Sequence, residues 1–513
     1  MLARLATFAL ATSLLAAGPL ACVVDFEVSI SDGLDDDLGE TSLDGESGLD
    51  DDPGDGPDDD TGVDTDPRPD IPDDEGSDEA DSDTDSDTGG ETEGGDESLP
   101  LYPGGRVHSP ITAPVVAALQ TLRAAAPGAA EDLFMKVGAS STVSTNTLYC
   151  FAQGPVDLDL HEGALGSTLD WFLAGEAVDT TPFDRETLAA QVGKTASWAL
   201  SGDPSPLEQE LEALAAGDPD AGPSLALVHY GTNDMQQGLT YASALPGYYA
   251  NMSDLLDLLT ERGVVPVVFG LSRRLDQDSA DLWVQSYNAV ARGLAQARAL
   301  PFVDLREALE HLDGYGISGD GLHLEAYAEG ACVLTEDGLG HGYNIRNLIA
   351  LESLARVSAA LLEDQPQAED QGAASLAGEG SIDAPFEIPA LPFADARDSA
   401  AGPTFELDVY SGCGSTADES GPEHVYRLEL AETTAIRAIV LDRAGVDVDL
   451  HLLDGLDVAD CLLRDDTMIE ATLEPGTYFL TLDTYVNGQG VEQAGDYDFV
   501  ILECEAGDTD CLL

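Results

Sequence analysis

The sequence predicts an α/β unit, with a parallel sheet covered by helices on both faces, followed by a small all-β sandwich. Between residues 102 and 362, short apolar runs alternate with amphipathic stretches long enough for helices, the pattern of strand–helix–strand repeats. From about residue 402, apolar and polar residues alternate with a period of two between Gly and Asp turns, which is typical of antiparallel strands. We therefore expect the α/β unit over 102–365, a linker over 366–401 and the sandwich over 402–513.

The first 22 residues, MLARLATFALATSLLAAGPLAC, combine one Arg, a short apolar run and small residues, which indicates a secretory signal. The segment resembles a bacterial lipoprotein signal, and Cys22 would then be the lipidated residue, although Pro19 and Leu20 depart from the usual pattern. Ordinary cleavage nearby is the alternative. We expect an exported bacterial protein: an outer-membrane or cell-surface lipoprotein attached to the membrane through Cys22, otherwise a periplasmic or secreted protein.

Residues 23–101 form an acidic stretch rich in Asp, Gly, Pro, Ser and Thr, with Arg68 as its single base. Such a composition predicts a disordered, self-repelling stalk. The whole chain has 20 Lys plus Arg against 99 Asp plus Glu, a formal net charge of −79. A surface of this sign repels phosphate backbones, so we expect no nucleic-acid partner.

Within the α/β unit, apolar runs predict five strands: DLFMKVGAS, ETLAAQVG, SLALVHYG, GVVPVVFG and LPFVDL, in chain order. Helical spacing in PITAPVVAALQTLRAAA predicts a first helix before them, which ends at Pro127. YYANMSDLLDLLTERG and VQSYNAVARGLAQARAL predict helices between later strands, and NLIALESLARVSAALL predicts the closing helix. In the sandwich, HVYRLELA, AIRAIVLD, VDLHLLD, TYFLTLDTY and DYDFVILE predict strands.

Four short motifs follow the predicted strands: VGASST, QVGKTASWAL, VHYGTNDM and SGDGLHL. Together they resemble the four signature blocks of the SGNH (GDSL-like) hydrolase family, over residues 133–324. The resemblance implies a flavodoxin-like three-layer α/β/α fold and a serine esterase activity on acyl or acetyl esters.

Carried over block by block, the resemblance implies that Ser140 is the nucleophile, His323 the base and Asp320 the carboxylate that orients the base. Gly193 and Asn233 match the oxyanion-hole residues. A Ser hydroxyl becomes a good nucleophile only when a neighbouring imidazole takes its proton, and a carboxylate holds that imidazole in one tautomer. Backbone N–H groups and a side-chain amide then stabilise the oxyanion.

One position departs from the family pattern, because Ala139 stands where the first block usually carries Asp. Ser141 is an alternative nucleophile and His341 an alternative base. The long separation between Ser140 and Gly193 predicts an insertion, from about residue 145 to 183, near the site.

Two other polar residues of the predicted strands have structural interpretations. We expect Asp304 to cap the helix after the fifth strand, and His229 to pack beside the third strand rather than react. The His residues show no zinc-ligand spacing, so we expect no metal and no cofactor.

The C-terminal segments EHVYRLEL, VDVDLHLLD, LEPGTYFLTLD and AGDYDFVILE resemble the bacterial pre-peptidase C-terminal (PPC) domain. That resemblance implies an accessory sandwich, with possible contact to a surface or polysaccharide. An alternative for the acids of DVDLHLLD is a calcium site.

Apart from Cys22, the chain has six cysteines, an even number that suggests disulfides in an oxidising compartment. If Ser140 and His323 meet in one site, the segments that follow them start close together, which predicts a Cys150–Cys332 disulfide. Of the three pairings open to the last four cysteines, we favour Cys413–Cys461 and Cys504–Cys511.

Two functions remain in view. The first is an exported esterase acting on a small-molecule or polymer-borne ester, and the complete set of Ser, His, Asp, Gly and Asn favours it. The alternative is a catalytically silent, surface-anchored binding protein with a vestigial hydrolase domain, which Ala139 favours. We expect the α/β unit and the sandwich to fold separately.

Overall fold

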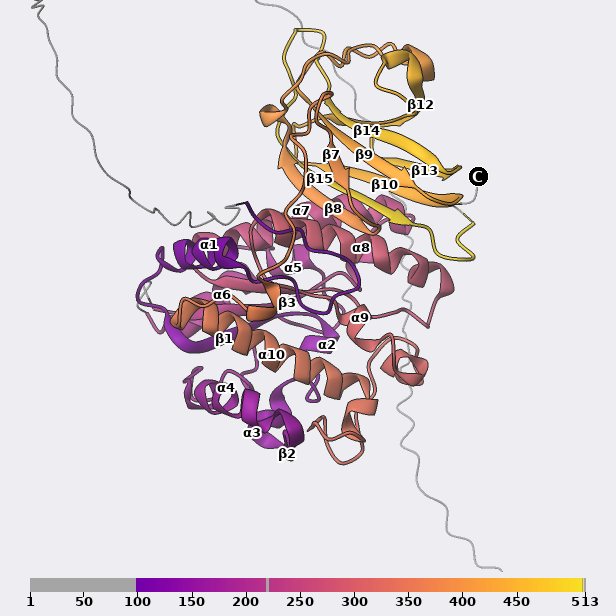
Figure 1. Ribbon diagram of the computed structural model, residues 1–513. Helices are drawn as coiled ribbons and strands as arrows, with labels where there is room; N and C mark the ends of the chain where they lie inside the picture. Colours follow the sequence, from indigo (N-terminus) through magenta and orange to yellow (C-terminus); the bar gives the residue numbers. More distant parts are fainter. Residues whose placement is uncertain (1–97, 218–220, 510, 512–513) are drawn as a thin grey trace, which may run out of the picture. The chain divides into compact units, whose positions relative to one another are not determined.

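The computed structural model describes residues 98–217, 221–509 and 511, and the first part of this chain folds around a parallel sheet (Figure 1). The strand order is β1-β3-β4-β5, and each pairing is parallel. These strands are β1 (Ala130–Gly138), β3 (Pro223–His229), β4 (Val265–Phe269) and β5 (Phe302–Val303). All residues of β3 and β4 are buried, which explains why their sequences are continuous apolar runs.

Helices pack on both sides of this sheet in two groups (Figure 1). One group contains α1 (Ala113–Arg123), α4 (Glu162–Ala174) and α10 (Gly342–Leu362). The other contains α5 (Ala196–Ala199), α7 (Tyr241–Glu261) and α8 (Asp278–Ala297). This is the three-layer α/β/α architecture that the sequence predicts. The remaining helices are α2 (Ser140–Val143), α3 (Tyr149–Gln153), α6 (Pro206–Leu214) and α9 (Leu305–Leu309).

Two local predictions about polar residues are confirmed. The Asp304 carboxylate caps α9 by accepting a hydrogen bond from the Glu307 N–H at 3.0 Å. His229 lies buried at the end of β3. Among the residues described, no helix combines the length and apolar character needed to cross a bilayer.

The predicted second strand, ETLAAQVG, is not formed. Only Ala190 makes a bridge, to Gly138 at the end of β1. The Gly138 N–H donates to the Ala189 carbonyl and the Gln191 N–H donates to the Gly138 carbonyl, both at 3.2 Å, after which the chain turns at Gly193. The segment is therefore a loop that contacts the sheet edge at one residue. Not all of its apolar side chains are buried, since Val192 is exposed.

The predicted insertion carries a small parallel pairing between β2 (Val156–Asp157) and β6 (Cys332–Val333). The predicted Cys150–Cys332 disulfide joins α3 to β6, with a Cα–Cα distance of 5.5 Å. The favoured pairings Cys413–Cys461 and Cys504–Cys511 are also present.

The C-terminal part is a sandwich of two sheets, with strand orders β13-β10-β15-β8 and β12-β11-β14-β9-β7. The strands are β7 (Phe386–Ile388), β8 (Phe393–Asp398), β9 (Glu423–Leu430), β10 (Thr434–Asp442), β11 (Val448–Leu453), β12 (Cys461–Asp465), β13 (Met468–Leu473), β14 (Gly476–Thr484) and β15 (Asp496–Glu503). Alternate side chains of both sheets form one apolar core. Within the described residues, no cluster of three or more His, Cys, Asp or Glu side chains has an arrangement that could hold a metal ion.

The predicted linker over 366–401 differs from the structure, because it contains β7 and β8. Each of these strands belongs to one sheet of the sandwich. The polar residues of this segment make it resemble a linker in the sequence. Asp395 of β8 is nevertheless buried, and its carboxylate accepts hydrogen bonds from the Arg397 Nε and the Tyr426 hydroxyl at 2.6 and 3.0 Å.

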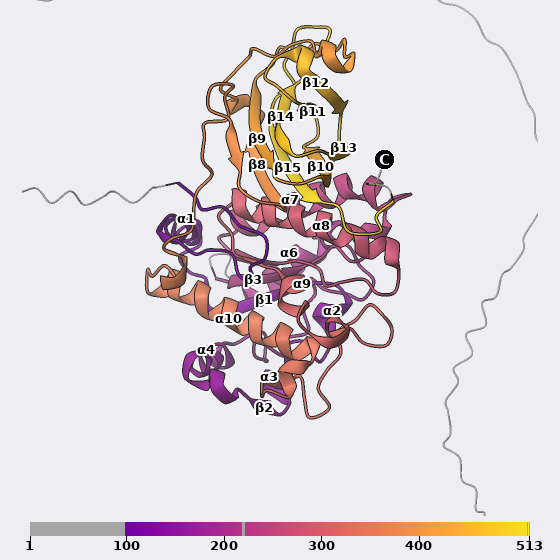
Figure 2. The same ribbon diagram turned by 45° about the vertical axis from the view of Figure 1, so that its right-hand side comes forward.

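The α/β part and the sandwich, which we expect to fold separately, are in direct contact. Helix α8 contacts β8 and β15 directly, as Figure 2 shows. Residues of α8 such as Val284 and Leu294 share one buried apolar cluster with Ala394 and Val500 of the sandwich. Helix α8 has apolar residues on more than one face. One face packs toward β4 and β5, and the sandwich sheet that contains β8 and β15 covers another.

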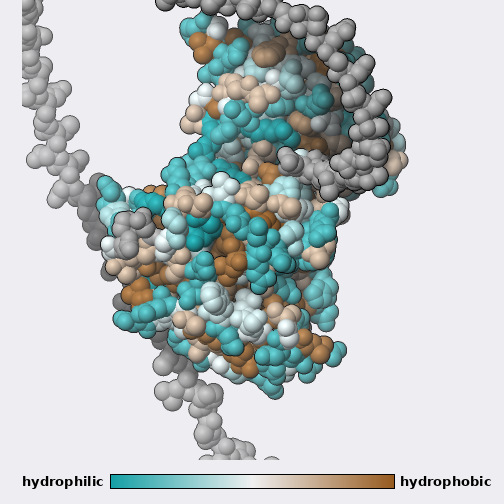
Figure 3. Space-filling view, turned by 60° about the vertical axis from the view of Figure 1, so that its left-hand side comes forward, coloured by the Kyte–Doolittle hydropathy of each residue, from teal (hydrophilic) through white to brown (hydrophobic). Residues whose placement is uncertain are grey.

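The predicted signal, Cys22 and nearly all of the predicted stalk lie outside the described residues. On the face seen in Figure 3, hydrophobic residues are dispersed among hydrophilic ones over the folded part of the chain.

Candidate active site

The carboxyl end of β1 carries the predicted nucleophile. Gly138 ends the strand, Ala139 precedes the helix, and Ser140 is the first residue of α2. The Ser140 Oγ lies 2.9 Å from the His323 Nε2, although 183 residues separate the two in sequence. Both side chains are partly exposed, so the pair remains accessible from solvent.

The turn that carries His323 also holds its partner carboxylate. The His323 Nδ1 lies 2.7 Å from the Asp320 Oδ2. The Asp320 Oδ1 accepts three further hydrogen bonds, from the Ser318 hydroxyl at 2.7 Å and from the Leu322 and His323 N–H groups at 3.0 and 2.9 Å. The hydrogen bond with His323, followed by these backbone N–H groups, holds the pKa of Asp320 well below its ordinary value.

These contacts define the tautomer of His323. An ionised carboxylate can only accept, so the Nδ1 carries the proton and donates it to Asp320. The Nε2 is then an acceptor and faces the Ser140 hydroxyl. Ser140, His323 and Asp320 therefore form one continuous hydrogen-bonded chain.

The loop after β3 holds Asn233. Gly231, at φ +130°, makes the turn, and the Asp234 carboxylate accepts hydrogen bonds from the Gly231 and Ala196 N–H groups at 3.0 and 2.9 Å. Burial raises the pKa of Asp234 to about 6. Asp234 thus ties the Asn233 loop to the segment that follows Gly193.

Asn233 is oriented by that same segment. Its Nδ2 donates to the Lys194 carbonyl at 2.9 Å. An amide NH₂ has two hydrogens, so this contact fixes the side chain and leaves a second N–H.

Gly193 is exposed at φ +74°, a backbone region that favours glycine, and a Cβ there would meet open space. Neither the Gly193 N–H nor the Ser140 N–H donates to a carbonyl within the part of the chain that the structure describes.

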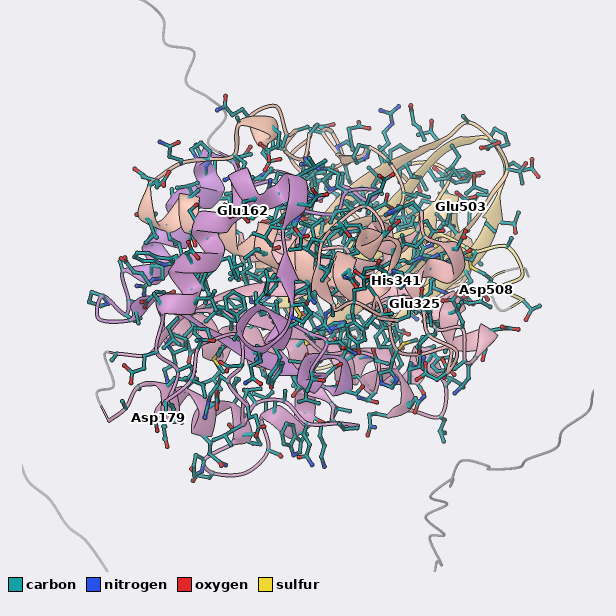
Figure 4. All side chains as sticks on the ribbon, turned by 90° about the horizontal axis from the view of Figure 1, so that it is seen from below. Glu162, Asp179, Glu325, His341, Glu503 and Asp508 are labelled. Atoms are coloured by element: carbon teal, nitrogen blue, oxygen red, sulfur yellow. A yellow bond between two sulfur atoms is a disulfide. The ribbon has the colours of Figure 1, made fainter. Side chains whose placement is uncertain are left out.

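The two alternatives to this site make other contacts. The Ser141 carbonyl accepts hydrogen bonds from the Thr147 hydroxyl and the Arg346 Nη1, at 2.6 and 2.5 Å. The Nδ1 of His341, which is labelled in Figure 4, lies 3.2 Å from the Asp337 carbonyl. The hydroxyl that His323 contacts is therefore that of Ser140.

Helix α10 carries three buried polar side chains that stand in none of the four motifs, and we call them the α10 polar cluster: Asn344, Arg346 and Asn347. Asn347 accepts a hydrogen bond from the Leu148 N–H at 2.9 Å and donates to the Asn146 carbonyl at 2.8 Å. The sequence does contain an indication of this cluster: three polar residues interrupt the otherwise apolar helical segment GYNIRNLIAL, and a helix that served only the core would not need them.

His229 belongs to the same buried region. Its Nδ1 accepts a hydrogen bond from the Arg346 Nη2 at 3.0 Å. Burial, together with the charge of Arg346, holds the pKa of His229 well below its ordinary value. His229 is therefore neutral, and it is buried at the end of β3.

Comparison with known proteins supports the interpretation of this fold. Residues 173–328 match the GDSL-like Lipase/Acylhydrolase family, a span that contains Gly193, Asn233, Asp320 and His323 and begins after Ser140. This match supports an enzyme that hydrolyses ester bonds. No curated protein matches the chain.

Several solved structures are similar at low identity. A GDSL-like lipase from Bacteroides thetaiotaomicron VPI-5482 aligns with 47% of this chain and 98% of its own, at 14% identity and a TM-score of 0.27. An acetyl xylan esterase from Geobacillus stearothermophilus aligns with 44% of this chain and 95% of its own, at 14% identity and a TM-score of 0.29. A peptidoglycan O-acetylesterase aligns with 34% and 46%, at 13% identity and a TM-score of 0.25. These scores are too low for the similarities to decide the substrate.

Proposed function

We propose that the protein is a serine esterase that hydrolyses acyl or acetyl esters. The observation that carries this proposal is the continuous chain from the Ser140 Oγ to the His323 Nε2 and from the His323 Nδ1 to the Asp320 carboxylate, at 2.9 and 2.7 Å. It is the arrangement that converts a Ser hydroxyl into a nucleophile.

In the first half of the reaction, the Ser140 Oγ forms a bond to the ester carbonyl carbon while its proton passes to the His323 Nε2. The carbonyl electron pair moves to the oxygen and makes an oxyanion. Collapse of this intermediate breaks the bond to the leaving alkoxide, which takes the proton back from His323. The products are an alcohol and an acyl group on Ser140.

In the second half, His323 accepts a proton from water as the water oxygen attacks the acyl carbon. Collapse then breaks the bond to the Ser140 Oγ, which recovers its proton from His323, and releases the acid. Asp320 remains ionised throughout and stabilises the imidazolium that forms in each half.

The oxyanion would be stabilised by the Ser140 and Gly193 N–H groups and by the remaining N–H of the Asn233 amide. Loss of one such donor typically raises the barrier by about 2.7–4 kcal/mol. The anchoring of Asn233 on Lys194 supports this role, because a donor held in place before the reaction loses little entropy in the transition state.

We also propose export, with Cys22 as a lipid anchor. The signal-like sequence of residues 1–22 motivates this proposal, and the three disulfides are consistent with it because such bonds persist in oxidising compartments. Labelling with a radioactive fatty acid tests it: incorporation that depends on Cys22 is expected, and a Cys22→Ser variant that still incorporates label would contradict it.

The esterase proposal is tested by hydrolysis of p-nitrophenyl acetate by the whole chain, with Ser140→Ala and Ser141→Ala as a matched pair. We expect activity in the wild type and in Ser141→Ala, and none above background in Ser140→Ala. Activity in none of the three, across a panel of acyl esters, would favour the silent binding protein instead.

A further inference from the structure

Arg346 is a buried guanidinium directly behind the candidate nucleophile helix. It lies on α10, more than two hundred residues after Ser140, and is 5% exposed. Its Nη1 donates to the Ser141 carbonyl at 2.5 Å and to the Thr147 hydroxyl at 3.1 Å. Its Nη2 donates to the His229 Nδ1 at 3.0 Å.

All of these partners are neutral. In a chain with 99 acidic residues, the described residues form many Arg–carboxylate pairs, yet the contacts of Arg346 include no carboxylate. A buried charge without a counter-ion is costly, because desolvation is not offset by an ion pair. Desolvation lowers the pKa of Arg346 to about 10, so the side chain still carries its charge at neutral pH.

The contacts of Arg346 hold the first turn of α2 from behind. The Ser141 carbonyl receives two hydrogen bonds, one from Arg346 and one from Thr147, and Thr147 in turn contacts Arg346. Because Ser140 and Ser141 are adjacent in one turn, fixing this carbonyl also fixes the direction of the Ser140 Oγ.

Little space adjoins the guanidinium, so a single water molecule is the largest donor that could enter beside it. Arg346, His229, Thr142 and Thr147 line one small cavity of about 10 Å³, which is room for roughly one water molecule. Two buried polar atoms of this wall, the His229 Nε2 and the Thr142 Oγ1, have no hydrogen-bond partner among the residues that the structure describes.

We propose that Arg346 is a positioning residue for the ester hydrolysis, acting through the Ser141 carbonyl to hold the Ser140 hydroxyl in line with His323; this inference rests on the proposed function. Its positive charge also lies on the protein side of the nucleophile, where it favours the negative charge that develops on the substrate oxygen. Arg346 itself does not touch the substrate.

The test uses the whole chain and four variants. Arg346→Met removes the charge and all three hydrogen bonds, and Arg346→Lys keeps the charge. Thr147→Val removes one hydrogen bond to the Ser141 carbonyl at nearly constant volume. Arg356→Met is the matched control, because Arg356 is on the same helix but pairs with Glu369 and Asp370.

Three quantities are measured: kcat and KM for p-nitrophenyl acetate, the rate of labelling of Ser140 by a fluorophosphonate, and the unfolding temperature. In Arg346→Met we expect kcat to fall roughly tenfold or more with KM little changed, since misplacement of a reacting group acts on the chemical step. Labelling should slow by a similar factor. Arg346→Lys should recover part of the loss.

Arg356→Met should lose stability but keep kcat within about twofold of the wild type. An Arg346→Met protein that folds and keeps wild-type kcat would overturn the proposal. Should Arg346→Met fail to fold, wild-type kcat in both Arg346→Lys and Thr147→Val would overturn it. A wild type without esterase activity would instead refute the proposed function.

Discussion

At the scale of single residues, the most organised group of the site is also one of its most exposed. The Asp320 side chain is 52% exposed, yet its two oxygens accept four hydrogen bonds from the turn that carries it. Exposed carboxylates usually sample several rotamers, and here the turn removes that freedom before substrate arrives. The orientation of His323 therefore depends on local backbone geometry rather than on burial.

This geometry predicts that replacing His323 and replacing Asp320 have unequal effects on the rate of hydrolysis. His323→Ala should abolish hydrolysis of p-nitrophenyl acetate, because no base remains. Asp320→Ala should be milder, since the base is still present although poorly oriented. The kcat values of the two variants, with Ser318→Ala as a control that removes only one of the four hydrogen bonds, provide the check. Equal loss in both variants would mean that Asp320 does more than orient.

Asn233 gives a second prediction at this scale. Asn233→Ala should lower kcat by roughly a hundredfold or more with KM little changed, because the lost donor acts on the oxyanion and not on the bound ester. Gln237→Ala is a suitable control: Gln237 is exposed in the same loop, and its side-chain amide donates to the Asn233 carbonyl at 3.5 Å. If KM rose instead while kcat held, Asn233 would be a substrate-binding residue.

At the scale of elements, the sandwich buries a row of acids across three strands. Asp449 of β11 is paired in register with Asp483 of β14, and Asp483 with Glu423 of β9. All three side chains are buried. Of the three, Asp449 is the one whose carboxylate forms an ion pair with Arg464. The Asp483 Oδ2 accepts a hydrogen bond from the Tyr410 hydroxyl at 2.6 Å, and its Oδ1 has no hydrogen-bond partner within the described part of the chain. Burial, and next the nearby Glu423, raise the pKa of Asp483 well above its ordinary value.

The raised pKa of Asp483 predicts a pH-dependent stability. The folded chain keeps this proton at pH values where the unfolded chain has released it. The free energy of unfolding therefore falls as pH rises above the unfolded pKa, by about 1.4 kcal/mol per pH unit for one such group, until the folded pKa is reached. Asp483→Asn removes this term and retains an acceptor for Tyr410.

We accordingly expect the Asp483→Asn variant to unfold at a higher temperature than the wild type, by a margin that grows as the pH rises above the ordinary pKa of an Asp carboxyl. Glu432→Gln, an exposed change between β9 and β10, should leave the margin near zero at every pH. A constant margin for Asp483→Asn would mean that this carboxyl is ionised in the folded chain.

The burial of an element determines whether it can be predicted from the sequence. β3 and β4 are covered on both faces, so their composition alone identifies them. ETLAAQVG has similar letters but touches the sheet at Ala190 only, and no property of its sequence distinguishes an edge strand from a loop that runs past the edge. β8 was missed for the opposite reason: its buried Asp395 looks like a linker residue until Arg397 and Tyr426 are seen beside it.

The residues of the candidate site also differ in whether they could be predicted from the sequence. Ser140, Gly193, Asn233, Asp320 and His323 stand in short motifs after predicted strands, and parallel strands bring such ends to one edge. Arg346 stands in no motif. Its place behind Ser141 depends on how α10 packs against the loops after β1, a long-range contact that spacing along the chain does not encode.

At the scale of the whole molecule, the α/β part and the sandwich share an apolar contact through α8. Besides the shared apolar cluster, the Gln296 Nε2 donates to the Ala394 carbonyl at 3.2 Å, and the Arg437 guanidinium lies 3.7 Å above the Trp283 ring. Loss of the sandwich would expose this face of α8 to water.

A chain that ends at residue 365 should therefore unfold at a lower temperature than the whole chain and aggregate more readily, because buried apolar surface becomes solvent-exposed. Thermal unfolding and light scattering provide the measurement. A chain that begins at residue 98 and keeps the sandwich is the control, and it should retain the full unfolding temperature. Equal unfolding temperatures for the whole chain and the chain ending at 365 would show that the shared contact contributes nothing to stability.

Whether Ser140 is the nucleophile can be determined by covalent labelling. The whole chain is incubated with a fluorophosphonate, which forms a stable covalent bond with an activated Ser hydroxyl, and the modified peptide is mapped by mass spectrometry. We expect one adduct, on Ser140, that does not form when His323 is replaced by Ala. An adduct on Ser141, or labelling of Ser140 that is independent of His323, would contradict the account.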